Sequence, residues 1–84
     1  MLETHAIKLD EIYVPVKLKK TLDAAKVDSL AESILEKGLE VPIQIRRDEA
    51  KGRYVLVSGF HRLEAVRALG EATVDAIIVT ARKF

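Results

Sequence analysis

The stretch Val57-Ser58-Gly59-Phe60-His61-Arg62 decides how this chain folds. Apolar residues at positions 54–57 predict a short strand that ends as this stretch begins. Apolar positions then recur at helical spacing over residues 61–69, which predicts a helix. A single glycine, Gly59, therefore links a strand to a helix. The first backbone N–H groups of a helix have no partner within it, so this junction is a candidate anion-binding site.

A second helix is predicted upstream, over residues 24–37. Asp23 is a good N-cap for it, and Gly38 suits its C-terminal end because glycine enters the left-handed region without strain. The apolar residues of this segment recur at helical spacing, and we expect them to form its buried stripe: Val27, Leu30, Ala31, Ile34 and Leu35.

Four strands are predicted: one within residues 6–14 that leads into an irregular stretch, then strands at residues 40–47, 54–57 and 73–79. The second of these is entered through Pro42, and the polar turn 48–52 joins it to the third in a hairpin. Residues 16–22 show no clear period and are predicted to form a loop. The sequence therefore predicts an α+β fold of roughly four strands, a small mixed sheet with two main helices.

The composition limits what this chain can do. Its 84 residues have room for one modest core, so we expect a single domain over residues 1–84. The 14 Lys and Arg residues against 13 Asp and Glu give a net charge of +1, so any binding to nucleic acid must come from a local patch. The chain has no cysteine, which excludes thiol redox chemistry and a structural zinc site of the thiolate kind.

The N-terminal residues form neither a basic nor an apolar segment, and no apolar run approaches the roughly 20 residues that span a bilayer. We therefore expect a cytoplasmic chain with no membrane partner. The two histidines, His5 and His61, lie far apart in the sequence and do not have metal-ligand spacing, so no metal site is predicted.

Two cations stand in the first turns of the predicted helices, where the helix dipole disfavours positive charge. Arg62 projects from the inner apolar stripe of its helix, while Lys26, Ser29 and Ser33 form a narrow polar stripe on theirs. If both helix starts face one pocket, these groups converge on a polyanion. A nucleotide phosphate chain fits such a pocket best.

Each of these residues also has a purely structural interpretation. Arg62 can pair with an internal carboxylate such as Glu64 or Asp75, and the two helix serines can simply face solvent. His61 can act as a capping residue. Phe60 can either pack in the core or form the floor of a base-binding pocket.

The chain resembles the ParB/sulfiredoxin-like superfamily from about Ile7 to Val79. The matching blocks occur in family order: Val14-Pro15, residues 22–30 with Ser33-Ile34, Gly38 with Val41-Pro42-Ile43, and Ser58-Gly59-Phe60-His61-Arg62. The resemblance implies the fold of that superfamily. In sulfiredoxin the corresponding positions contact ATP, which implies as ATP ligands Lys26, Ser29, Ser33, His61 and Arg62.

One position departs from the sulfiredoxin pattern. Phe60 stands where sulfiredoxin has the cysteine that attacks a phosphorylated sulfinate, so sulfinate reductase activity is not expected. ParB partition proteins carry a related box that binds CTP, and relatives described as ParB-like nucleases and free-serine kinases use the same pocket for other phosphoryl chemistry. Glu36, Glu40 and Glu64 are available carboxylates, but no catalytic residue is assigned.

These observations predict a nucleotide-binding module that acts in DNA partition or regulation. Its ligand is expected to be ATP or ADP, with or without Mg²⁺, and its partners DNA or another protein. The alternatives are a phosphotransferase or ParB-like nuclease that uses the same phosphate pocket, and a degenerate structural relative. The predicted nucleotide-binding residues are Lys26, Ser29, Ser33, Gly59, Phe60, His61 and Arg62.

Overall fold

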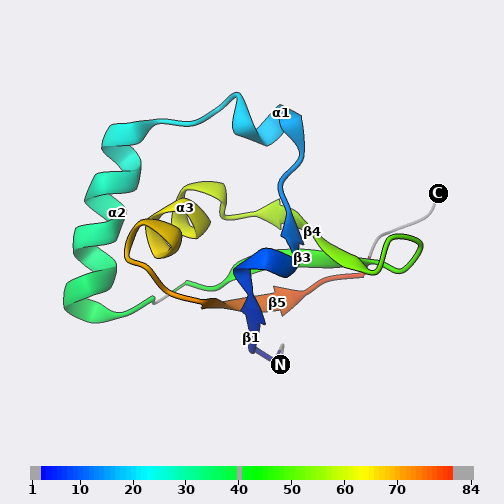
Figure 1. Ribbon diagram of the computed structural model, residues 1–84. Coiled ribbons are helices and arrows are strands. Elements are labelled where there is room, and N and C mark those ends of the chain that lie inside the picture. Colours follow the sequence, from blue (N-terminus) through cyan, green and yellow to red (C-terminus); the bar gives the residue numbers. More distant parts are fainter. Residues whose placement is uncertain (1–2, 40, 81–84) are drawn as a thin grey trace.

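The computed structural model describes residues 3–39 and 41–80 and contains one mixed five-stranded sheet, in the order β1-β5-β3-β4-β2 (Figure 1). The strands are β1 (His5–Lys8), β2 (Ile12–Tyr13), β3 (Ile43–Asp48), β4 (Arg53–Ser58) and β5 (Thr73–Ile78). The predicted hairpin is confirmed, since β3 pairs antiparallel with β4. On its other side β3 pairs parallel with β5, while β1 lies antiparallel to β5 and β2 lies parallel to β4.

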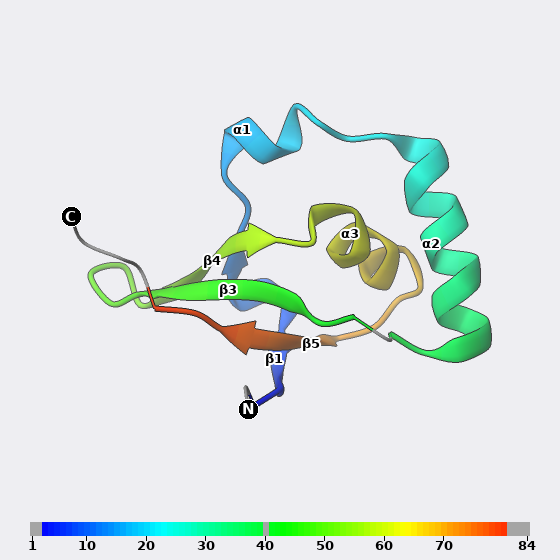
Figure 2. The same cartoon turned by 180° about the vertical axis from the view of Figure 1, so that it is seen from behind.

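Three α-helices and one 3₁₀ turn complete the described part of the chain: the turn at Leu9–Glu11, α1 (Val16–Lys19), α2 (Ala24–Lys37) and α3 (Phe60–Ala68). Helix α3 packs on the sheet, and α2 packs against α3 from the outside (Figures 1 and 2). The predicted α+β fold, a small mixed sheet with two main helices, is confirmed.

The core lies between the sheet and α3. Ile43, Ile45 and Leu63 are fully buried there, and Phe60 at the start of α3 is only 8% exposed. The remaining buried apolar residues are Ile7, Leu9, Ile12, Val14, Val55, Leu56, Ala65, Val66, Val74 and Ala76. Because both ends of the β4–α3 junction are anchored in this core, the junction is a fixed part of the fold. None of the helices in the described ranges has the length and apolarity that a membrane span requires.

Four details of the sequence prediction were wrong. The sheet has five strands rather than roughly four, because the turn Leu9–Glu11 divides the first predicted segment into β1 and β2. Residues 16–19 form helix α1 rather than a loop, because Pro15 starts a single turn that is too short to show a period. Leu35 is 76% exposed rather than buried, and no residue of α2 is fully buried, because α2 packs mainly against α3 and covers a narrower stripe than its pattern suggests. Val41 lies outside the strand and is 54% exposed, since Pro42 has no N–H with which to extend the ladder.

The N-cap of α2 carries a testable stability prediction. The Asp23 carboxylate accepts hydrogen bonds from the backbone N–H groups of Ala25 and Lys26, at 3.1 and 3.3 Å. Asp23→Ala should therefore lower the free energy of unfolding by about 1 kcal/mol, measured by urea denaturation. Asp28→Ala removes the same side chain from an exposed position within α2 and should change stability by less than about 0.5 kcal/mol. Equal losses in both variants would contradict a capping role for Asp23.

Candidate functional site

The structure brings the starts of the two main helices together. The Nε2 atom of His61, in the first turn of α3, accepts a hydrogen bond of 3.1 Å from the backbone N–H of Asp23, the N-cap of α2. This bond joins residues 38 positions apart in the sequence. The two helix N-termini, which the sequence could not place relative to one another, therefore lie side by side.

A cavity of about 340 Å³ lies at this meeting point. It is lined by Lys26, Leu30, Gly59, Phe60, His61 and Arg62. Five of the seven residues predicted from the sequence are thus gathered around one cavity. Ser29 and Ser33 are exposed on α2 and do not line it. Leu30 was not predicted as a lining residue, although its position one turn after Lys26 on the same helix face was a usable signal.

Arg62 is held by backbone carbonyls. Its NH1 group donates a hydrogen bond of 3.1 Å to the carbonyl of Pro42 and a longer one of 3.5 Å to that of Val41. Within residues 3–39 and 41–80, no carboxylate forms an ion pair with Arg62, and Glu64 pairs instead with Arg67 at 3.2 Å. A half-buried guanidinium oriented by two carbonyls still has donors to offer, and a guanidinium favours an anion as its partner.

The start of α3 differs from the start of α2 in a way that matters for anion binding. The N-terminal N–H groups of α2 already donate to the Asp23 carboxylate. Helix α3 follows Gly59, which has no side chain, and no side-chain acceptor caps its N-terminus. The unpaired donors of the site therefore belong to α3, next to the cavity that Arg62 and Lys26 line.

His61 and Phe60 both line the cavity. Nε2 of His61 is the acceptor in this hydrogen bond, so the ring nitrogen left to act as a donor is Nδ1. The Phe60 and His61 rings meet edge to face, with centroids 5.4 Å apart. Phe60 packs in the core and also lines the cavity, so its structural interpretation is confirmed, while its role in a base-binding pocket stays a prediction.

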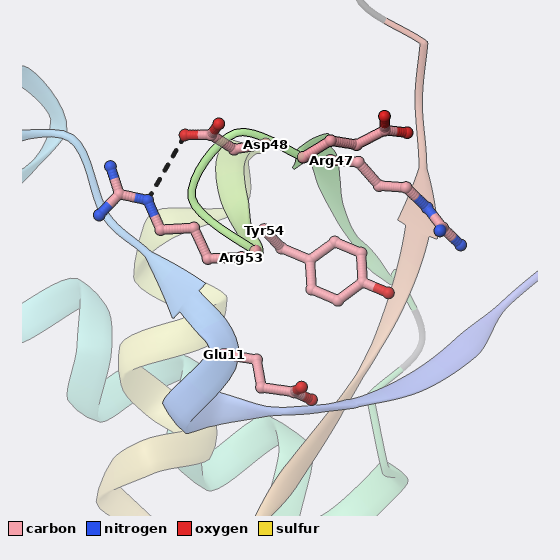
Figure 3. A pocket seen from close by; sticks show the side chains of 7 residues that line it. Glu11, Arg47, Asp48, Arg53 and Tyr54 are labelled. Atoms are coloured by element: carbon pink, nitrogen blue, oxygen red, sulfur yellow. Dashed lines mark ion pairs between the residues drawn. The ribbon is translucent and has the colours of Figure 1, made fainter.

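A second cavity, of about 220 Å³, lies at the far end of the β3–β4 hairpin (Figure 3). Arg53 there pairs with Asp48 at 3.6 Å, and its guanidinium lies 3.9 Å from the centre of the Tyr13 ring. With Glu11 and Glu49 added, three carboxylates outnumber the two arginines of this cavity, so it does not suit an anion. Elsewhere too, the described residues include no group of three side chains that could hold a metal ion.

Comparison with known proteins identifies the family. The family model for the ParB N-terminal domain matches residues 1–83. A probable chromosome-partitioning protein ParB from Campylobacter jejuni is 38% identical over 77 residues, which is 90% of this chain and 27% of that protein. The chain thus spans about a quarter of the length of this relative.

Solved structures agree with that assignment. The crystal structure of sulfiredoxin from Arabidopsis thaliana matches with a TM-score of 0.83 and 33% identity, over 94% of this chain and 86% of that one. A C-terminally truncated chromosome-partitioning protein ParB from Caulobacter crescentus, complexed with CTP-gamma-S, matches with a TM-score of 0.81 and 23% identity, over 95% of this chain and 46% of that one. The fold is therefore the ParB/sulfiredoxin-like fold, and the chain belongs to the ParB N-terminal domain family.

Proposed function

We propose that this chain binds a nucleotide through its phosphate groups, in the cavity between the N-termini of α2 and α3, and that the nucleotide is ATP or ADP. The observation that carries the proposal is the uncapped start of α3 beside Arg62 and Lys26. Two cations placed against two helix dipoles are stabilised when an anion lies between them.

Each residue of the predicted site has a role in this proposal. The backbone N–H groups after Gly59 and the guanidinium of Arg62 hold the same phosphate, and Lys26 neutralises the next one. His61 donates from Nδ1, while the edge of Phe60 closes the floor. Ser29 and Ser33 continue the face of α2 that begins at Lys26, so they are proposed to contact a longer phosphate chain. Mg²⁺, if bound, is held by the phosphates.

The comparisons support a nucleotide without choosing its base. The C. crescentus ParB structure contains CTP-gamma-S, so a chain of this fold can hold a nucleoside triphosphate. A resemblance to the ATP-contacting positions of sulfiredoxin favours ATP, and the positions are Lys26, Ser29, Ser33, His61 and Arg62. Because the family is that of ParB, we propose that nucleotide binding serves DNA partition or its regulation. Phe60 cannot act as a nucleophile, so sulfinate reductase activity is not part of the proposal.

Calorimetric titration of the wild-type chain with ATP, ADP and CTP, with and without Mg²⁺, tests the proposal. We expect saturable binding with one site per chain and a preference for the adenine nucleotides. Tighter binding of CTP would still support the phosphate site, but it would show that the preferred base is cytosine rather than adenine. If none of the three nucleotides binds, the proposed function is wrong.

Lys26→Ala should weaken ATP binding by about threefold to tenfold, because a partly solvated ammonium contributes less than a guanidinium fork. Lys37→Ala is the matched control, since Lys37 is an exposed lysine at the opposite end of the same helix. Calorimetry should show unchanged affinity for the control. Equal losses in the two variants would mean that overall charge, rather than the cavity, determines the affinity.

A further inference from the structure

Two hydrogen bonds in series connect His61 on α3 with Lys26 on α2. The backbone N–H of Asp23 donates to Nε2 of His61 at 3.1 Å. The carboxylate of the same Asp23 accepts from the backbone N–H of Lys26 at 3.3 Å. Asp23 is the N-cap of α2, so both bonds act on the first turn of that helix. The place of Lys26 beside the cavity is therefore tied to the imidazole of His61.

The rest of the contact between α2 and α3 is apolar. In the part of the chain that the structure describes, no other side-chain hydrogen bond and no ion pair joins α2 or its N-cap to α3. The inner stripe of α2, which includes Leu30 and Ile34, is only partly covered. Apolar burial is non-directional, so it holds α2 against α3 without fixing where the first turn of α2 lies. A hydrogen bond is directional and can fix that position.

The two cations of the cavity differ in how they are held. Arg62 donates to the carbonyls of Val41 and Pro42, just before β3, and this anchor does not involve α2. The ammonium of Lys26 makes no hydrogen bond or ion pair with a described residue. Its reach into the cavity therefore depends on where the first turn of α2 lies. A shift of that turn would move Lys26 away from a bound phosphate and leave Arg62 in place.

We propose that His61 is a positioning residue of the phosphate site: its Nε2 atom holds the start of α2, through Asp23, where Lys26 reaches the nucleotide. This role rests on the proposed nucleotide binding, and it is separate from the donor at Nδ1. The contribution of Lys26 to the affinity then requires an acceptor at the Nε2 position of residue 61. The contribution of Arg62 does not require it.

Two substitutions separate the two ring nitrogens of His61. His61→Gln puts an amide oxygen near the position of Nε2 and keeps an acceptor for Asp23, whereas His61→Asn is too short to reach it. NMR should show solvent exchange of the Asp23 amide proton about tenfold faster in His61→Asn, and at the wild-type rate in His61→Gln. The amide proton of Leu63, which donates to the carbonyl of Gly59 at the start of α3, is the reference and should not change.

Calorimetric titration with ATP tests the consequence for binding. Lys26→Ala should weaken ATP binding by about threefold to tenfold in the wild-type and His61→Gln backgrounds, but by less than about twofold in His61→Asn. Arg62→Ala is the matched control, because it should weaken binding by about tenfold or more in all three backgrounds. Thermal unfolding establishes that each variant is folded at the temperature of the titration.

The positioning role is overturned if Lys26→Ala weakens binding equally in the wild type and in His61→Asn. It is also overturned if exchange of the Asp23 amide proton is unchanged in His61→Asn, or if the effect of Lys26→Ala is lost in His61→Gln as well. Each of these results, obtained with a wild type that binds ATP, refutes the positioning role alone. A wild type that binds no nucleotide refutes the proposed function, and the role of His61 is refuted with it.

Discussion

Gly59→Ala should destabilise this domain by about 2–5 kcal/mol, the largest stability loss that we expect from adding one methyl group. Gly59 adopts φ of +97°, a left-handed conformation that costs other residues about 1–2 kcal/mol. A Cβ atom there would lie 2.8 Å from Cγ2 of Ile43 and 3.2 Å from its Cα. Ile43 is fully buried, so it cannot move aside without overpacking the core, at a further cost of about 1–3 kcal/mol.

Urea and thermal denaturation measure this loss, and Gly52→Ala is the control. Gly52 also has a positive φ, of +61°, but a Cβ atom at that position meets nothing within 4 Å. In Gly52→Ala the free energy of unfolding should fall only by the conformational cost of the left-handed backbone, about 1–2 kcal/mol. In a domain of this size each kcal/mol lowers Tm by about 4–8 °C, so the two variants are readily distinguished. Equal losses would contradict the close packing of β3 against the junction.

Much of the fold could be predicted because its signals are local. Asp23 and Gly59 mark the helix starts through short-range chemistry, and each predicted helix boundary lies within one residue of the observed one. The hairpin was visible because two apolar runs flank a polar turn. Such features depend on neighbouring residues alone, and the sequence contains all of them.

The sheet order and the burial of α2 could not be predicted from the sequence. The pairing of β3 with β5 joins segments about thirty residues apart, and no local pattern specifies it. The exposure of Leu35 depends on α2 covering α3 rather than the sheet. Helical spacing gives the direction of an apolar stripe but not the width of the surface that it meets.

In the candidate site, too, the locally determined features could be predicted and those that depend on tertiary packing could not. Lys26 and Arg62 were recognisable as cations placed against helix dipoles, and the structure puts both on one cavity. The hydrogen bond from Asp23 to His61 was not foreseeable, because it joins two helix starts through tertiary packing. The same applies to Arg62, whose contacts are the carbonyls of Val41 and Pro42 and not a carboxylate among the described residues.

Arg62→Ala should reduce ATP affinity by about tenfold to a hundredfold, because the loss of a charge-assisted hydrogen bond costs about 1.5–3 kcal/mol. The truncation removes the guanidinium that lines the cavity. It also removes the hydrogen bonds to Val41 and Pro42, so some loss of stability is expected beside the loss of binding. Both quantities must therefore be measured on the same protein.

Arg67→Ala is the matched control, since Arg67 lies on the same helix but does not line the cavity. Its affinity for ATP should equal that of the wild type. Thermal unfolding of both variants establishes that each is folded at the temperature of the titration.

Calorimetric titration of ATP into wild type, Arg62→Ala and Arg67→Ala is the most direct test of the phosphate site between α2 and α3. We predict saturable binding by wild type and Arg67→Ala, and binding at least about tenfold weaker by folded Arg62→Ala. Wild-type affinity in folded Arg62→Ala would contradict the site.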